Sequence, residues 1–185
     1  LAPARAYLPP GLEGGHRAWG LAAQLYALRS PGNWGIGDFS DLAELLTGAA
    51  KSGAAAVGVN PLHALFPDEP ARASPYSPSS RLFLNPLYID VPAVTDFAEC
   101  EPAQALLAES DFADALMQAR QVELVDYPAV AALKRRAMTL LYGNFRERHL
   151  EHEGDPRAEA FRAFRAEGRR DLRRFAVFET LREHL

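Results

Sequence analysis

The pattern of apolar and polar positions changes near the middle of the chain, which predicts two halves of different architecture. Two short apolar runs without charge lie in the first half, at residues 19–28 and 54–59. Near-continuous apolar runs are typical of strands that are covered on both faces in a parallel sheet. We therefore expect parallel, neighbouring strands near residues 20–27 and 55–60.

The segment between these runs has the pattern of an amphipathic helix. Asp38 is a suitable N-cap, and Asp41 places an acid in the first turn. Apolar residues then recur at helical spacing as far as Gly53, a typical C-terminal stop. A strand, a helix and a second strand predict a βαβ unit.

Residues 60–88 contain six prolines separated by serine, aspartate and arginine, which predicts a long loop. Irregular segments of this length are more often functional than simple connections. Within the loop, Ser74-Pro-Tyr-Ser-Pro-Ser-Ser80 has the composition of a flexible linker, but its prolines equally favour an ordered loop. An ordered loop would either display Tyr76, whose ring can pack on a sugar, or bury it under the proline turns.

The second half is rich in alanine, leucine, glutamate and arginine, and it predicts helices. One covers about residues 111–120, and a longer one begins after Asp126 with Pro128 in its first turn. One or two more follow Asp155-Pro156. Acids are interleaved with the arginines of residues 162–174, so this basic stretch fits a solvated helix face better than a nucleic-acid surface.

Composition narrows the possible functions. With 185 residues, 48% hydrophobic, the chain fits a globular class but is too short for a complete eight-stranded α/β barrel of about 250 residues. A net charge of −4 disfavours nucleic acid, and no apolar run is long enough to span a membrane. The single cysteine, Cys100, suits the reducing cytoplasm, which we take as the expected location, although it would also suit many periplasmic proteins. Because the chain begins at Leu1, we expect it to be a piece of a longer protein.

Two other features suggest chemistry only weakly. Gly35 and Gly37 precede the first helix, as in a phosphate site, but the fuller glycine fingerprint is missing and a tight turn explains them. The histidines form no recognisable ligand spacing, although His149 and His152 could share a helix face. We therefore expect no metal and no cofactor.

Five motifs follow one another in a segment of the first half, and together they resemble a known family. They are Gln24-Leu-Tyr-Ala-Leu-Arg-Ser30, Asn33-Trp-Gly-Ile-Gly-Asp-Phe39, Asn60-Pro-Leu-His-Ala-Leu-Phe66, Ala73-Ser-Pro-Tyr-Ser-Pro-Ser-Ser80 and Leu84-Asn-Pro-Leu-Tyr-Ile-Asp-Val91. In this order they look like the signatures of the 4-α-glucanotransferases, the amylomaltase or disproportionating-enzyme family, and are nearest to its longer bacterial members.

The resemblance implies an α/β fold, namely a partial (β/α)8 TIM barrel followed by a mainly helical insertion subdomain. It divides the chain into an N-terminal linker (1–16), the start of the barrel with a substrate loop (17–95) and the helical insertion (96–185). The implied activity is retaining, double-displacement transfer of α-1,4-glucan segments between maltooligosaccharides. The catalytic carboxylates of the family lie on later strands, so we expect none in this chain, and we expect the chain alone to be inactive.

The substrate-binding residues that the resemblance implies are Ser74, Tyr76, Asn85 and His63, of which Asn85 and His63 could instead brace the loop. The expected partners are maltooligosaccharides or other α-1,4-glucans and the remainder of the same polypeptide, with no nucleic acid and no membrane. Two alternatives stay open. The chain could be part of an α-glucan hydrolase of the same superfamily, or a non-catalytic helical interaction module with a proline-rich docking segment.

Overall fold

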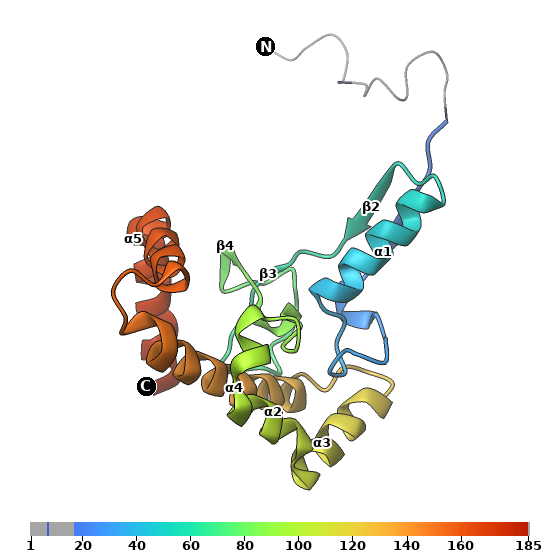
Figure 1. The fold of residues 1–185 in the computed structure, drawn as a ribbon. Helices are drawn as coiled ribbons and strands as arrows, with labels where there is room; N and C mark the ends of the chain where they lie inside the picture. The colour runs from blue at the N-terminus through green and yellow to red at the C-terminus, as the bar shows by residue number, and fades with distance from the viewer. Residues whose placement is uncertain (1–6, 8–16, 185) are drawn as a thin grey trace.

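The computed structural model describes residue 7 and residues 17–184, so the expected linker over 1–16 lies almost wholly outside the described residues. The first half contains two small sheets, and helices make up the second half (Figure 1). The elements are β1 (Gly20–Ala23), η2 (Leu25–Ala27), α1 (Phe39–Lys51), β2 (Ala56–Val59), β3 (His63–Ala64), β4 (Ser80–Leu84), η3 (Pro86–Tyr88), η4 (Thr95–Glu99), α2 (Glu101–Ala108), α3 (Ser110–Gln121), α4 (Tyr127–Phe145), η5 (Arg146–Leu150) and α5 (Pro156–His184).

The predicted βαβ unit is present. β1 and β2 pair in parallel, with Leu21 opposite Val57, and α1 connects them. The helix begins where the sequence indicates, because the Asp38 carboxylate accepts hydrogen bonds from the backbone N–H groups of Ser40 and Asp41. The Asp41 carboxylate in turn accepts one from the backbone N–H of Asp38. It ends before Gly53, whose φ of +82° is the left-handed conformation that favours glycine.

The burial of both faces that such apolar runs have in a complete parallel sheet is not reached in the described part of the chain. Leu21 is 39% exposed, and β2 alternates between exposed and half-buried residues. The reason is that, among the described residues, this sheet has only two strands, of which β2 packs against α1. The first strand also ends at Ala23 rather than near residue 27, and η2 turns Leu25 into the core, where it is fully buried.

The segment that was expected to be one long loop contains an antiparallel hairpin. His63 of β3 pairs with Leu84 of β4, and Ala64 pairs with Ser80. The prolines of this segment lie between the two strands or just outside them, so they interrupt neither strand. The loop expectation is therefore wrong for β3, β4 and the short helix η3, and correct for most of residues 65–79.

The helices of the second half agree with the sequence pattern. The Asp126 carboxylate caps α4 by accepting a hydrogen bond from the backbone of Ala129, and Pro128 lies in the first turn. The predicted helix over about residues 111–120 corresponds to α3, whereas the pattern did not predict α2 as a helix of its own. The last helix, α5, is kinked at Arg169, where φ is 45°. Among residues 17–184, no helix combines the length and the apolar character needed to cross a membrane.

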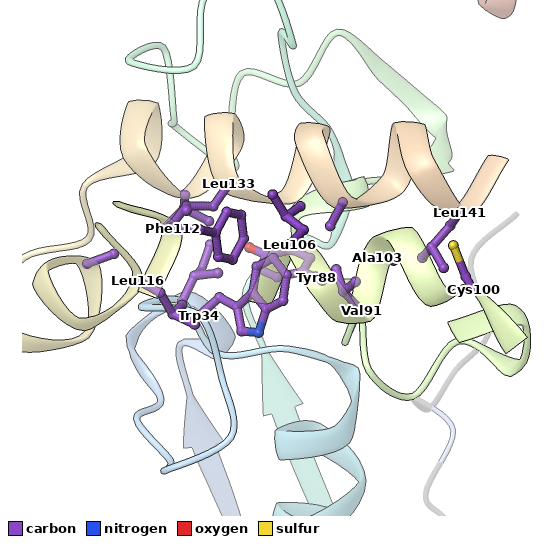
Figure 2. Packing of buried hydrophobic residues seen from close by; sticks show 14 of the residues in the cluster. Trp34, Tyr88, Val91, Cys100, Ala103, Leu106, Phe112, Leu116, Leu133 and Leu141 are labelled. Carbon is purple, nitrogen blue, oxygen red and sulfur yellow. The ribbon is translucent and has the colours of Figure 1, made fainter. Parts of the chain in front are cut away.

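One hydrophobic core joins the two halves of the chain (Figure 2). The ring of Trp34 packs edge-on against the ring of Phe112 on α3, with centroids 5.5 Å apart. Gly35 lies beneath α3 so closely that a Cβ atom would approach the Ala119 carbonyl oxygen to 2.3 Å. Gly35 therefore permits close packing against α3, a role that the tight-turn interpretation did not include, while its φ of +83° fits a turn. Other core residues are Leu25, Ile36, Tyr88, Val91, Cys100, Ala103, Leu106, Leu116, Leu133 and Leu141.

Candidate substrate site

The loop between β3 and β4, residues 65–79, carries two of the four residues expected to bind substrate. Ser74 is exposed, and 68% of Tyr76 is accessible to solvent. The backbone N–H of Ser77 donates to the carbonyl of Ser74 at 3.1 Å, which closes a turn around Pro75 and Tyr76. The alternative in which the proline turns bury Tyr76 is therefore wrong, and the ring and hydroxyl of Tyr76 face solvent.

Ser79 anchors the second end of this loop to β3. Its backbone N–H donates to the carbonyl of Ala64 at 2.9 Å, and its hydroxyl donates to the carbonyl of Leu65 at 2.7 Å. These bonds span the loop from its last residue to its first. They favour the ordered loop over the flexible linker, and the composition of the serine-rich segment did not single out Ser79.

The other two expected residues, His63 and Asn85, lie together at the base of the hairpin. His63 pairs with Leu84, and the N–H of Asn85 donates to the carbonyl of Leu62 at 2.9 Å. Asn85 is buried, and its Oδ1 accepts from the N–H of Leu87 at 3.0 Å, which begins η3. The Asn85 side chain therefore braces η3 in this structure, while His63 is half-buried. A direct substrate contact of either residue stays a prediction.

Asn60, the first residue of the motif over residues 60–66, connects three elements. Its Oδ1 accepts from the N–H of Leu25 at 2.7 Å, and its Nδ2 donates to the hydroxyl of Tyr88 at 3.1 Å. Burial raises the pKa of that Tyr88 hydroxyl. The end of β2 is thereby joined to η2 and η3. The signals in the sequence were the Asn-Pro pair at the end of an apolar run and its place at the start of the motif over residues 60–66.

Lys134 of α4 is buried under the segment that follows the hairpin. Its ammonium donates to the carbonyls of Leu87 at 2.7 Å and Ile89 at 2.6 Å. Burial lowers the pKa of Lys134 to about 8, although the nearby carboxylates of Asp38 and Asp90 act in the opposite direction. Burial also raises the pKa of Asp38. The lysine fixes η3 against α4, and an isolated lysine in a helix gave no sequence signal for this role.

One cluster has the donor types of a metal site. Ligand atoms of Asp96, Glu99 and His149 lie within 4.8 Å of one another. However, both oxygens of Asp96 accept from the Arg157 guanidinium, at 3.0 and 2.7 Å. The His149 ring bonds to Glu99 at 2.6 Å and to Asp155 at 2.9 Å, rather than sharing a site with His152. These pairs account for the cluster as an ion network that joins η4 to η5 and α5.

Comparison with known proteins defines the family to which this chain belongs. A family model described as 4-alpha-glucanotransferase matches residues 23–185. The chain is 45% identical over 145 residues to a 4-alpha-glucanotransferase of Haemophilus influenzae, covering 78% of this chain and 21% of that protein. It is 38% identical over 181 residues to the 4-alpha-glucanotransferase of Mycobacterium tuberculosis, covering 94% of this chain and 24% of that protein.

A solved structure supports the same class. The crystal structure of amylomaltase from Corynebacterium glutamicum matches with a TM-score of 0.67 at 30% identity, over 84% of this chain and 21% of that chain. The fold of this chain is therefore similar to part of the fold of that amylomaltase. The chain belongs to the 4-alpha-glucanotransferase family. It spans only 21% and 24% of the length of the two curated relatives named above.

Proposed function

We propose that this chain is the substrate-holding part of a 4-α-glucanotransferase, in which the loop over residues 65–79 binds maltooligosaccharide. The observation that carries the proposal is the exposed Tyr76 on a loop with an anchored end, in a chain of this family. An exposed tyrosine offers a flat apolar face for a pyranose ring and a hydroxyl for its polar rim. Ser74, close by in sequence, offers a second hydroxyl.

The β1–α1–β2 unit then forms the start of a (β/α)8 barrel, and the helices after residue 95 form an insertion that packs beside it. Parallel pairing of β1 with β2 supports this arrangement. In such barrels the loops that follow the carboxyl ends of strands build the active site. Residues 60–88 follow β2 directly, so the substrate loop lies in the part of the sequence that this rule selects.

The proposed reaction is a retaining transfer in two displacements. An aspartate attacks the anomeric carbon while a glutamate protonates the leaving oxygen, so the α-1,4 bond breaks as a glycosyl-enzyme ester forms. The glutamate then takes the proton from the 4-hydroxyl of an acceptor, which displaces the aspartate. We assign none of these carboxylates to this chain. In this proposal the residues of this chain bind and orient the glucan, and the remainder of the polypeptide supplies the catalytic carboxylates. The proposed location of the reaction is the cytoplasm.

The experiment uses the protein that contains this chain at the length of its relatives. Incubation with maltotriose should yield glucose together with maltopentaose, because one maltosyl unit is transferred for each glucose that is released. An α-glucan hydrolase would instead give glucose and maltose without longer products. Isomaltotriose, which has α-1,6 bonds, serves as the matched control sugar. Absence of any product longer than maltotriose would overturn the proposal.

A further inference from the structure

Helix α5 contacts both sides of the candidate substrate loop, although it lies far from it in the sequence. Phe175 and Arg182 are seven residues apart and therefore lie on the same face of the helix. The ring of Phe175 stacks on Phe83 of β4, with centroids 4.4 Å apart and an angle of 17° between the planes. Arg182 reaches Asp68, which lies on the other side of the loop.

The pairing of Arg182 with Asp68 has the geometry of a strong, directional contact. Nη2 lies 2.6 Å from Oδ2, and Nε lies 3.1 Å from Oδ1, so the guanidinium binds the carboxylate through two nitrogens. The side chains of Arg182 and Asp68 are only 25% and 20% exposed. The Arg182 guanidinium lowers the pKa of Asp68 accordingly. Partial burial and bidentate geometry distinguish this pair from the exposed ion pairs of the chain.

A second contact continues from Arg182 toward the tip of the loop. Its guanidinium lies 4.7 Å from the ring centroid of Phe66, and the guanidinium of Arg72 lies 3.8 Å from the same centroid. Arg72 precedes Ser74 by two residues. Arg182 therefore holds the segment that leads into the Ser-Pro-Tyr turn, through Asp68 directly and through Phe66 to Arg72.

The position of Tyr76 depends on these anchors. Within residues 17–184, Tyr76 shares in no hydrogen bond, ion pair or ring contact, and most of its surface is exposed. Its location follows from the two ends of the loop, one held by Ser79 and the other by Arg182. Ser79 belongs to the hairpin itself, whereas Arg182 is 114 positions beyond Asp68 in the sequence.

We infer that Arg182 is a positioning residue for glucan binding, through which helix α5 sets the place of the loop that carries Ser74 and Tyr76. This inference rests on the proposed function. Arg182 does not touch the glucan. It restrains residues 66–72, and a loop restrained before binding loses less conformational entropy when the glucan binds. Removal of the contact should therefore weaken substrate binding while leaving bound substrate correctly reactive.

The test compares Arg182→Gln, Asp68→Asn and the double variant in the full-length protein. We expect each single variant to raise KM for maltoheptaose about five- to thirtyfold, the factor that corresponds to about 1–2 kcal/mol, with kcat changed less than about twofold. The KM of the double variant should be no higher than that of either single variant, because each single substitution already removes the same contact. Arg146→Gln, which removes an exposed ion pair with Glu151, is the matched control and should leave KM unchanged.

Hydrogen exchange supplies a readout that is independent of activity. The backbone amides of residues 66–78 should exchange faster in Arg182→Gln than in the parent, while those of α4 stay the same. Arg182→Lys keeps the charge but loses the planar guanidinium, so its KM should lie between those of the parent and Arg182→Gln. This variant replaces Arg182→Gln in both measurements if Arg182→Gln does not fold. An active parent whose KM and loop exchange are unaffected by these variants would overturn the inference. A parent without transfer activity would instead overturn the proposed function, and the exchange comparison would still test the role of Arg182.

Discussion

The ammonium of Lys134 donates a hydrogen bond to the carbonyl oxygen of Leu87 at 2.7 Å, which joins the middle of α4 to the Asn-Pro-Leu-Tyr segment. The same ammonium reaches Ile89, and Lys134 is only 1% exposed. A buried lysine is costly unless its donors are paired. The two hydrogen bonds from Lys134 hold η3 in place. In this position of η3, the hydroxyl of Tyr88 accepts a hydrogen bond from Asn60 at the end of β2.

Lys134→Met should lower the free energy of unfolding by about 1–3 kcal/mol, because two carbonyls lose their donor. Urea denaturation measures this value, and Arg136→Met on the exposed face of α4 should cost less than about 0.5 kcal/mol. Between about pH 8 and 10.5 the unfolded parent keeps a proton that the folded parent has lost. Parental stability should therefore rise with pH relative to Lys134→Met across this window. Equal stability of parent and variant at pH 7 would contradict the role of Lys134.

The ion network around His149 predicts a second pH dependence. Hydrogen bonds to Glu99 and Asp155 raise the pKa of His149, whereas His149 lowers the pKa of Asp155. A raised histidine pKa gives a stabilisation that is complete below the unfolded value of about 6.5 and lost as pH rises through the folded value. The lowered pKa of Asp155 gives a second stabilisation of the folded state, which is present above about pH 4 and is lost as the pH falls below that value.

His149→Gln should therefore differ most from the parent in stability between about pH 4 and 6.5, and the difference should shrink toward pH 9. Thermal unfolding in a pH series measures it. His152→Gln is the matched control, because His152 is exposed and its side chain has no hydrogen bond in the described part of the chain. A difference that stays constant from pH 5 to 9 would show that ionisation of His149 does not contribute.

Local signals predicted most of the α-helices, whereas contacts between distant residues could not be predicted. Asp38 and Asp126 cap α1 and α4 as the sequence indicates, because a cap depends on the next three residues. The β3–β4 hairpin depends on His63 meeting Leu84, and the many prolines between them masked it. Nothing near Leu25 in the sequence shows that its N–H bonds to Asn60, so the end of β1 was placed too late.

In the candidate site, too, local features of the sequence identify a residue, whereas the contacts with distant residues that hold it in place could not be predicted. Tyr76 could be singled out from its loop, because an aromatic residue between prolines is a local feature, and the five ordered motifs supplied the family. Its anchors could not be found in this way. Ser79 is one of several serines in a row, and Arg182 is one of many arginines in α5, so their roles emerge only where the chain brings Leu65 and Asp68 to them.

The exposed sheet of β1 and β2 predicts self-association of the chain over residues 1–185. Leu21 is 39% exposed, and β1 has a single neighbouring strand among the described residues. An apolar strand with an open edge is a template for pairing between molecules. Leu21→Lys should therefore reduce association in sedimentation velocity, whereas Leu124→Lys, at an exposed leucine outside the sheets, should not. A parent chain that stays monomeric over a wide concentration range would contradict this expectation.

Tyr76 projects from the loop over residues 65–79, proposed above to bind glucan, with most of its side chain exposed, so its truncation should affect binding rather than folding. Tyr76→Ala should lower kcat/KM of the full-length protein by roughly tenfold to over a hundredfold, the equivalent of about 1–3 kcal/mol, because it removes a stacking face and a hydrogen-bonding group. The melting temperature should stay unchanged, since a residue that is 68% exposed contributes little to the core.

Tyr76→Phe keeps the ring and should recover the part of the loss that stacking explains. Tyr142→Ala removes a tyrosine of similar exposure, 52%, on α4 and should leave kcat/KM unaffected. If the contact lies away from the cleaved bond, long donors should suffer more than maltotriose. A Tyr76→Ala protein with parental kcat/KM would remove Tyr76 from the site, whatever its stability.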